Sequence, residues 1–304
     1  MKNTKSSINV FAIFMLVVAA VIWGGSFVVV KDSLDYVTPL WQLAIRLGVA
    51  SVTGLIILPS QLKYINKKIL FQGVVLGIIF ACAVIPQNLG AELTTAGKCA
   101  FLTVSYVAFT PIIELIALKK GLTIQKTAAV VICLTGIAFI TLNERLTLQT
   151  GDILLLITGF FYGVHLVWID GCDRGKGILA VHILQIFTST VIALAAALIF
   201  EPFKVSVNRD FIFAMLYGGI LEVFVGFLLQ IKGQQGTNPS LAGILLSMEC
   251  VYAAIFGIIF QGDKIAGKML AGCVLVFASA VIAAVEFELP IGKHRSAVLQ
   301  KDVK

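Results

Sequence analysis

Charged side chains are scarce in this chain. Asp, Glu, Lys and Arg together make up 13% of its 304 residues, whereas a soluble globular domain carries about a quarter. Hydrophobic residues make up 59%, and the mean hydropathy is +1.00. Because so few charges cannot cover a surface that faces water, the composition excludes a soluble domain and predicts an integral membrane protein.

The sequence also lacks the short motifs that mark several kinds of catalytic site. It has no G-x-x-x-x-G-K-[ST] phosphate loop, which argues against a built-in ATP motor. It has no H-E-x-x-H or G-x-S-x-G, the motifs of zinc peptidases and serine hydrolases. No two of its six cysteines form C-x-x-C, and we interpret them as packing residues. We therefore expect no metal, no cofactor and no enzymatic activity.

Basic residues lie mainly in the connections between apolar runs and in the tails. The net charge is +7, but this placement favours contact with anionic lipid, and we expect no nucleic-acid partner. Fifteen lysines and arginines fall on one side of the expected membrane and seven on the other. Because the cytoplasmic side carries such an excess, we expect a plasma or inner membrane protein with both termini cytoplasmic. Met1–Lys5 resembles the start of a signal peptide, but no A-x-A site follows, so we expect a retained first helix.

Ten apolar runs follow one another, each near the length of roughly 20 residues that a spanning helix needs. Their approximate ranges are 10–30, 39–58, 69–90, 97–118, 124–142, 151–170, 178–200, 210–231, 239–261 and 265–286. Asn238 and Pro239 suit the cap and the first turn of a helix, so they predict the start of the ninth run.

The two halves of the chain resemble each other. The offset is 143 residues (239 − 96) for the fourth and ninth runs, and 139 for the first and second runs against the sixth and seventh. The aligned pairs are Ala96 with Pro239, Tyr106 with Glu249, Trp23 with Tyr162, and Arg46 with Gln185. We therefore expect two five-helix repeats, at 10–143 and 151–286, followed by a cytoplasmic tail at 287–304.

An odd number of crossings per repeat has a geometric consequence. The second repeat must enter the membrane from the opposite side, so the fold class that we expect is an all-α integral membrane protein with ten transmembrane helices in two inverted five-helix repeats. Alternating-access transporters use this architecture, with the binding site near the membrane midplane between the halves.

Four short motifs carry a resemblance to a known family. They are Ile22–Phe27 (I-W-G-G-S-F), Ala96–Thr103 (A-G-K-C-A-F-L-T), Ser247–Glu249 (S-M-E) and Gly262–Lys264 (G-D-K). In order, spacing and duplication they resemble the drug/metabolite transporter superfamily, EamA branch, over about residues 10–286. The resemblance implies a ten-helix secondary transporter, often an exporter of amino acids or other small metabolites. It also implies a central cavity lined by the first four helices of each half, with the fifth and tenth helices peripheral.

Three charged residues lie near the middle of apolar runs: Arg46, Glu222 and Glu249. Each costs roughly 2.5–3.5 kcal/mol at the bilayer centre, so we expect them to face the cavity, with Arg46 paired to a carboxylate. That pair is either a fixed structural link between helix two and helix eight or nine, or part of a substrate or ion pathway. Desolvation favours the neutral form of the carboxylate that stays unpaired. We hypothesise that Glu222, which departs from the family pattern, couples protons, and that Glu249, which matches it, is architectural.

Seven further residues are candidates for the substrate or ion pathway. Trp23, Tyr106 and Tyr252 offer aromatic walls. The amides of Gln87, Asn88 and Gln230 either contact the cavity edge or cap helix ends. Lys98 either attracts anionic groups of a substrate or extends to lipid headgroups.

Two other polar residues have structural interpretations. We interpret Glu114 as an interfacial charge near the inner face and His165 as a hydrogen-bonded packing residue.

These observations favour a secondary transporter that moves a small organic metabolite, of the amino acid, nucleoside or amine class, by alternating access. Export is the direction that the resemblance implies. A non-transporting scaffold or sensor is the alternative, and a membrane-embedded enzyme is a weaker one. The sequence is compatible with coupling to protons or another ion and with a homodimer.

Overall fold

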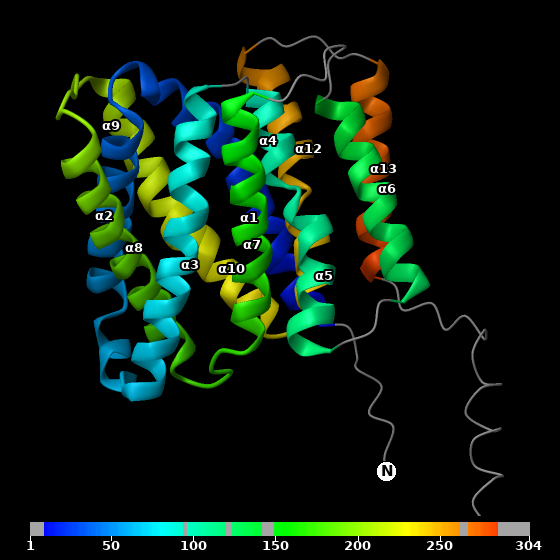
Figure 1. The fold of residues 1–304 in the computed structure, drawn as a ribbon, viewed down its shortest axis with the longest axis horizontal. Coiled ribbons are helices and arrows are strands. Elements are labelled where there is room, and N and C mark those ends of the chain that lie inside the picture. The colour runs from blue at the N-terminus through cyan, green and yellow to red at the C-terminus, as the bar shows by residue number, and fades with distance from the viewer. Residues whose placement is uncertain (1–8, 94–95, 120–122, 142–148, 262–266, 285–304) are drawn as a thin grey trace, which may run out of the picture.

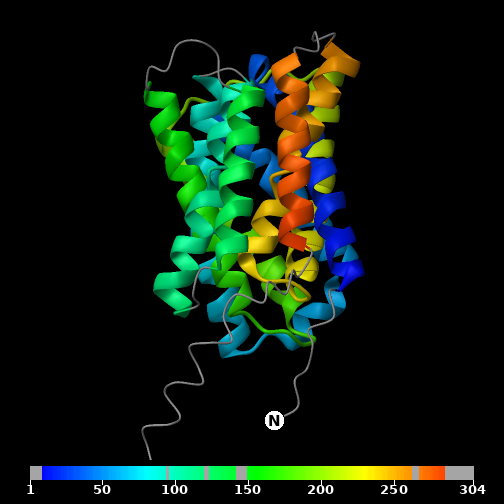
Figure 2. The ribbon, with the colours of Figure 1, turned by 90° about the vertical axis from the view of Figure 1, so that its right-hand side faces the viewer.

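The computed structural model describes residues 9–93, 96–119, 123–141, 149–261 and 267–284. Within these ranges the chain forms helices and no strand, apart from an isolated bridge between Val37 and Val205. The helices stand side by side along one direction and form a bundle (Figures 1 and 2). The first part of the bundle consists of α1 (Val10–Asp32), η1 (Ser33–Asp35), α2 (Pro39–Ile57), η2 (Pro59–Tyr64), α3 (Lys67–Glu92), α4 (Ala96–Thr103), α5 (Tyr106–Leu118) and α6 (Ile124–Thr141). The rest consists of α7 (Thr150–Asp170), α8 (Ile178–Phe200), α9 (Arg209–Leu216), the π-helix η3 (Tyr217–Gly226), α10 (Phe227–Gln234), α11 (Pro239–Leu246), α12 (Glu249–Phe256), η4 (Gly257–Gln261) and α13 (Gly267–Ala284).

Among the described residues, seven stretches are long and apolar enough to cross a bilayer, and three shorter apolar helices accompany them. Two of the predicted apolar runs contain a short interruption, between α4 and α5 and between α11 and α12. A third passes through the π-helix η3. The chain is therefore an all-α, multi-pass membrane protein, as its composition predicts.

An asparagine caps the start of three of the helices. The side chains of Asn66, Asn208 and Asn238 each accept a hydrogen bond from the backbone amide three residues later, at 2.8–3.0 Å. Such caps satisfy amides that have no partner inside the helix. The cap and first turn predicted at Asn238 and Pro239 are confirmed.

The bundle is apolar outside and carries polar groups inside. Ile116, Ile124 and Phe200 are each about three-quarters exposed, which suits contact with lipid tails. Inside the bundle, two histidines are completely buried and hydrogen-bonded. The ring of His165 hydrogen-bonds Gln185 at 3.0 Å, and that of His182 hydrogen-bonds the carbonyl of Phe224 at 3.0 Å. His165 is thus the packing residue that the sequence predicts.

Helices α6 and α13 pack against each other at one edge of the bundle (Figure 1). Buried residues of both helices belong to one core cluster with residues of α1, α5, α11 and α12, and a second cluster joins α2, α3, α8 and the segment from η3 to α10.

Glu114 differs from its predicted position. It is buried, and Ser240 of α11 donates a hydrogen bond to its carboxylate. The side chain points between α5 and α11 rather than outward to the membrane interface.

Candidate substrate cavity

A cavity of about 80 Å³ lies inside the bundle. Eight of the ten residues predicted from the sequence line it: Trp23, Arg46, Gln87, Asn88, Tyr106, Glu222, Gln230 and Glu249. The other lining residues are Ser26, Phe27, Leu34, Gln42, Ala91, Cys99, Thr103, Tyr162, Leu166, Phe227 and Leu246. Of the described residues, those of α6, α8 and α13 contribute none to this lining. The volume has room for several ordered water molecules or part of a small organic molecule.

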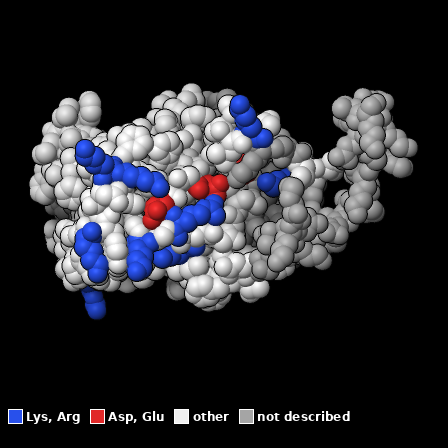
Figure 3. All heavy atoms as spheres, turned by 90° about the horizontal axis from the view of Figure 1, so that it is seen from below, with Lys and Arg blue, Asp and Glu red and all other residues white. Residues whose placement is uncertain are grey.

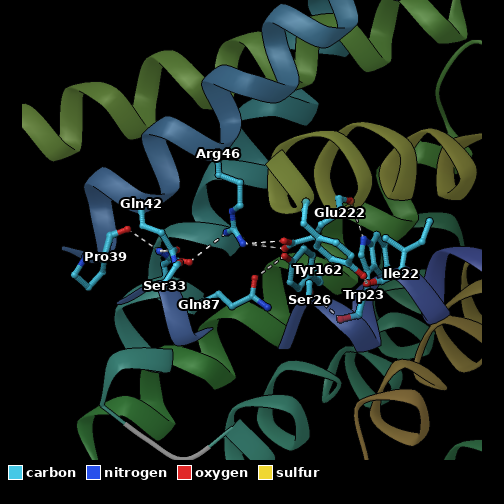
Figure 4. Close-up of polar contacts among 12 residues, drawn as sticks. Ile22, Trp23, Ser26, Ser33, Pro39, Gln42, Arg46, Gln87, Tyr162 and Glu222 are labelled. Atoms are coloured by element: carbon cyan, nitrogen blue, oxygen red, sulfur yellow. Dashed lines mark hydrogen bonds and ion pairs between the residues drawn. The ribbon is translucent and has the colours of Figure 1, made fainter. Parts of the chain in front are cut away.

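An ion pair between α2 and η3 dominates one wall of the cavity (Figure 4). Nη1 of Arg46 lies 3.0 Å from both carboxylate oxygens of Glu222. Nη2 of Arg46 donates to Oδ1 of Asn88 at 3.2 Å. Arg46 is only 5% exposed, and a charge so buried requires a partner of opposite sign. Glu222, rather than Glu249, is therefore the carboxylate that pairs with Arg46.

A chain of hydrogen bonds holds Asn88 in place behind the arginine. Nδ2 of Asn88 donates to the carbonyl of Pro39 at 2.6 Å and to Oε1 of Gln42 at 2.8 Å. Gln42 in turn donates to Oγ of Ser33 at 2.7 Å. Because each amide is satisfied from two sides, the guanidinium group has one preferred orientation.

The π-helix positions Glu222. Single π-helical turns are rare and occur often at functional sites, and here ten residues of η3 carry the carboxylate to the cavity. Nε1 of Trp23 donates to the backbone carbonyl of Glu222 at 3.0 Å, and the hydroxyl of Tyr217 donates to the carbonyl of Ile22 at 2.9 Å. These two bonds fasten η3 to α1.

Tyr106 and Glu249 meet across the cavity. The tyrosine hydroxyl donates to Oε1 of Glu249 at 3.1 Å, and both residues are about 95% buried. Each is the first residue of a helix that follows an interruption, α5 after α4 and α12 after α11. These are also the two positions that the sequence offset aligns with each other.

The amides that were candidates for helix capping make tertiary contacts instead. Gln87 and Asn88 lie inside α3, and Oε1 of Gln87 accepts a hydrogen bond from the hydroxyl of Tyr162 at 2.8 Å. Gln230 lies inside α10 and faces the cavity. Since α3 continues to Glu92 and α10 to Gln234, these side chains are too far from the helix ends to cap them.

Three buried polar atoms on the cavity wall have no hydrogen-bond partner among the described residues. They are Nε of Arg46, Oγ1 of Thr103 and Oε1 of Gln230. Most buried polar atoms in proteins are hydrogen-bonded, so groups of this kind call for an explanation. Their common position favours a polar molecule, water or ligand, in the cavity.

Two of the sequence candidates are not part of the described cavity. Tyr252 is half-buried, and its Cβ lies against α1 at Gly24, at the contact between α1 and α12. The rotation of α12 about its axis, which its sequence does not fix, turns Glu249 to the cavity and Tyr252 away from it. Lys98 belongs to α4, but its side chain lies outside the part of the chain that the structure describes.

The sequence analysis missed several lining residues, and two of them have a signal in the sequence. Tyr162 aligns with Trp23 in the repeat and lines the same cavity. Gln42 lies four residues before Arg46, about one helical turn. Thr103 and Phe227 carry no signal that separates them from other residues of their helices.

The model of the EamA-like transporter family matches residues 10–142 and again residues 149–285. The chain belongs to the EamA-like transporter family. The resemblance to the drug/metabolite transporter superfamily is thereby confirmed.

Relatives of this EamA family member carry transporter names. An "Uncharacterized transporter" of Archaeoglobus fulgidus is 27% identical over 274 residues, which cover 90% of this chain and 86% of that protein. The "Uncharacterized transporter YoaV" of Bacillus subtilis is 21% identical over 269 residues, 86% of this chain and 92% of that one. A crystal structure with a TM-score of 0.73 and 14% identity covers 90% of this chain and 96% of its own, and shows the fold alone. Family and relatives support a membrane transporter rather than an enzyme.

Proposed function

We propose that this EamA family member is a secondary transporter that carries a small organic metabolite by alternating access of the central cavity. The observation that carries the proposal is the cavity itself, a buried set of charged and polar groups to which both halves of the chain contribute lining residues. The chain would have ten crossings, arranged as the inverted repeats 10–143 and 151–286.

The positions of the helices support the repeat. The described parts of helices α6 and α13, Ile124–Thr141 and Gly267–Ala284, occupy corresponding places in the two halves of the chain. Helix α3 and the segment α9–α10 correspond with an offset of 142 at both ends (209 − 67, 234 − 92). The family model also matches the chain twice. Matching element bounds over both halves are the expected result of duplicating a five-helix unit.

The interruptions in the helices support movement about the cavity. The break after α4 covers Val104 and Ser105, and the break after α11 covers Ser247 and Met248, again 143 residues later. At both breaks the backbone hydrogen bonds shift to the tighter three-residue spacing, as between Ser105 and Leu102 and between Met248 and Leu245. Short segments of this kind inside a helix often mark hinges.

The charge distribution supports an orientation with both termini in the cytoplasm. Figure 3 views the end of the bundle that carries η2, and lysine and arginine clearly outnumber acidic residues there. Exposed basic residues of this region include Lys63, Lys67, Lys68, Arg174 and Lys176. By the positive-inside rule this end faces the cytoplasm.

The cavity lies closer to the opposite end. Leu34, in η1, lines both the cavity and a shallower surface depression that also contains Asp35, Glu92 and Lys204. Towards the basic end, Gln234 donates to the carbonyl of Leu166 at 3.0 Å. This arrangement supports an outward-facing conformation whose cytoplasmic side is closed.

Proteoliposome flux tests the proposal. Purified protein is reconstituted, and uptake and counterflow of amino acids, nucleosides and amines are compared with vesicles that lack the protein. Flux without chemical change supports a transporter, and loading from either side establishes whether export predominates. Chemical conversion of a compound would favour a membrane enzyme, whereas binding without flux would favour a sensor or scaffold.

The coupling hypothesis for Glu222 stays a prediction. Its pairing with Arg46 is equally what a fixed structural link between α2 and η3 requires. If Glu222 couples protons, Glu222→Gln abolishes the response of flux to an imposed pH gradient while substrate binding persists. If Glu222→Gln still transports and responds to the pH gradient as the unmodified protein does, Glu222 does not couple protons and its pair with Arg46 is a structural link. Among the described residues, Arg46 acts directly on this carboxylate, and Tyr162, Tyr217 and Glu249 are further ionisable groups that interact with it.

A further inference from the structure

The charges on the cavity wall do not balance. The charge of Arg46 is matched by the Glu222 carboxylate at Nη1, and Nη2 donates to Asn88. Glu249 has one described partner, the neutral hydroxyl of Tyr106. One guanidinium group and two carboxylates leave the described cavity with one unmatched negative charge when both glutamates are ionised.

The geometry points to a small organic cation as the substrate of the cavity, with its ammonium group against Glu249. This inference rests on the proposed transport function and names the substrate class for it. A carboxylate that is buried inside a membrane protein is stabilised by a cation or by a proton. A substrate ammonium supplies the missing charge and up to three hydrogen-bond donors.

The remaining walls suit such a ligand. Aromatic rings of Trp23, Phe27, Tyr106, Tyr162 and Phe227 line the cavity. Aromatic faces attract cations, most strongly where water is excluded. The hydrogen bond from Tyr106 also places one of these rings directly beside the Glu249 carboxylate. The same rings offer apolar contact to the hydrocarbon part of an amine.

The unpartnered atoms add a second observation. Oε1 of Gln230 is an acceptor without a donor among the described residues, and Oγ1 of Thr103 can also accept. Both suit the donor groups of an ammonium ion. Nε of Arg46 is a donor, which suits a hydroxyl group or water near the ligand.

Anionic and zwitterionic substrates fit less well. The two terminal nitrogens of Arg46 already bind Glu222 and Asn88, so a substrate carboxylate would have only the single Nε–H of that side chain to bind unless it displaced Glu222. It would also lie in a cavity with two other carboxylates, those of Glu222 and Glu249. The structure therefore favours an amine over the amino acid that shares its side chain.

A set of four compounds with similar carbon skeletons tests the charge preference. The probes are 3-methylbutylamine, its zwitterionic counterpart leucine, the neutral 3-methylbutanol and the anionic 4-methylpentanoate. Calorimetry on purified protein at neutral pH measures binding, which requires no flux. We expect the amine to bind at least tenfold more tightly than each of the others. Equal or tighter binding of leucine, of the alcohol or of the anion would overturn the assignment.

Variants locate the preference at Glu249. Glu249→Gln should remove the tenfold advantage of the amine over the alcohol, and Glu249→Asp should keep most of it. Tyr106→Phe, which frees the carboxylate from its hydrogen bond, should keep or increase amine binding. Glu114→Gln is the matched control, because Glu114 is buried but does not line the cavity. An unchanged preference in a folded Glu249→Gln variant would overturn the assignment.

A flux measurement separates this inference from the proposed function. The N,N,N-trimethyl derivative of 3-methylbutylamine is used because it has no uncharged form that leaks through lipid. The protein could bind amines selectively but transport neither this cation nor any compound in the transport panel. That result would overturn the proposed transport function and leave the cation site standing. Transport of leucine with no preference for the amine would support the transport function and overturn the assignment of a cation site.

Discussion

At the scale of single residues, the network around Arg46 explains how a membrane protein accommodates a charge in its interior. The guanidinium group has Glu222 on one side and Asn88 on the other, and Asn88 is itself held by Gln42 and Pro39. Each side chain in this hydrogen-bonded network is held in place by its neighbour. Removing one charge should therefore cost more than removing both.

Arg46→Gln should lower the free energy of unfolding by about 3–5 kcal/mol, because it leaves Glu222 as an uncompensated buried charge. The double variant Arg46→Gln/Glu222→Gln should recover most of that loss. Thermal unfolding of the purified protein in detergent measures both. Arg174→Gln is the control, since Arg174 pairs with Asp170 at an exposed site, where such pairs contribute about 0–1 kcal/mol. A double variant as unstable as Arg46→Gln would contradict the interpretation.

A second residue-scale network runs through the two buried histidines. The carbonyl of Phe224 can only accept, so Nε2 of His182 carries the proton. Nδ1 of His182 then accepts from Gln185, whose Oε1 accepts from His165. The network ties α7 and α8 to the π-helix that carries Glu222.

His182→Phe should destabilise the protein by about 1–3 kcal/mol, because it leaves the buried Gln185 amide without its acceptor and removes one of the two donors to the Phe224 carbonyl. Chemical denaturation monitored by circular dichroism in detergent would measure the loss. His182→Gln keeps a donor on the side chain and should lose less. Equal stability of His182→Phe and the unmodified protein would show that the network is not needed to hold η3.

At the scale of helices, the interior depends on close approach of backbones. A Cβ atom at Gly24 would lie 2.9 Å from both the carbonyl oxygen of Glu249 and the amide nitrogen of Ala253. Helices α1 and α12 can therefore touch only because residue 24 has no side chain. This contact also fixes the depth at which Glu249 faces the cavity.

Gly24→Ala should lower stability by about 1–3 kcal/mol, since α1 and α12 must move apart to admit the methyl group. The shift should also weaken ligand binding at Glu249. Gly48→Ala is the control, because nothing lies within 4 Å of a Cβ at that position of α2, and it should be neutral or slightly stabilising. Thermal unfolding and probe binding on both variants measure the contrast. Equal effects of the two substitutions would refute the role of the close contact.

At the scale of the whole molecule, the proposal requires one end of the bundle to face the cytoplasm and the other the outside. Lys63 lies at the basic end, in η2, and Lys204 lines the depression at the opposite end. The described cysteines are all buried or half-buried, so background labelling of the protein should be low.

In intact cells, a membrane-impermeant maleimide should label Lys204→Cys. It should label Lys63→Cys only after the membrane is made permeable. The unsubstituted chain is the control for background, detected by a mass shift on a gel. Labelling of both positions from the same side would contradict the proposed topology and with it the inverted arrangement of the halves.

The sequence by itself determined the membrane class, the approximate positions of the apolar runs and the internal offset, because these follow from the length of apolar runs, from local caps such as Asn238 and from direct comparison of the two halves. It also identified most of the polar residues of the cavity, since a charge or amide within an apolar run has few low-energy positions other than the interior. Only the tertiary structure decided that Arg46 pairs with Glu222, that Glu249 meets Tyr106, and that Tyr252 packs against α1. Those outcomes depend on how each helix is rotated and how deep it sits, and the rotation is set by packing against neighbours that lie more than a hundred residues away in the chain.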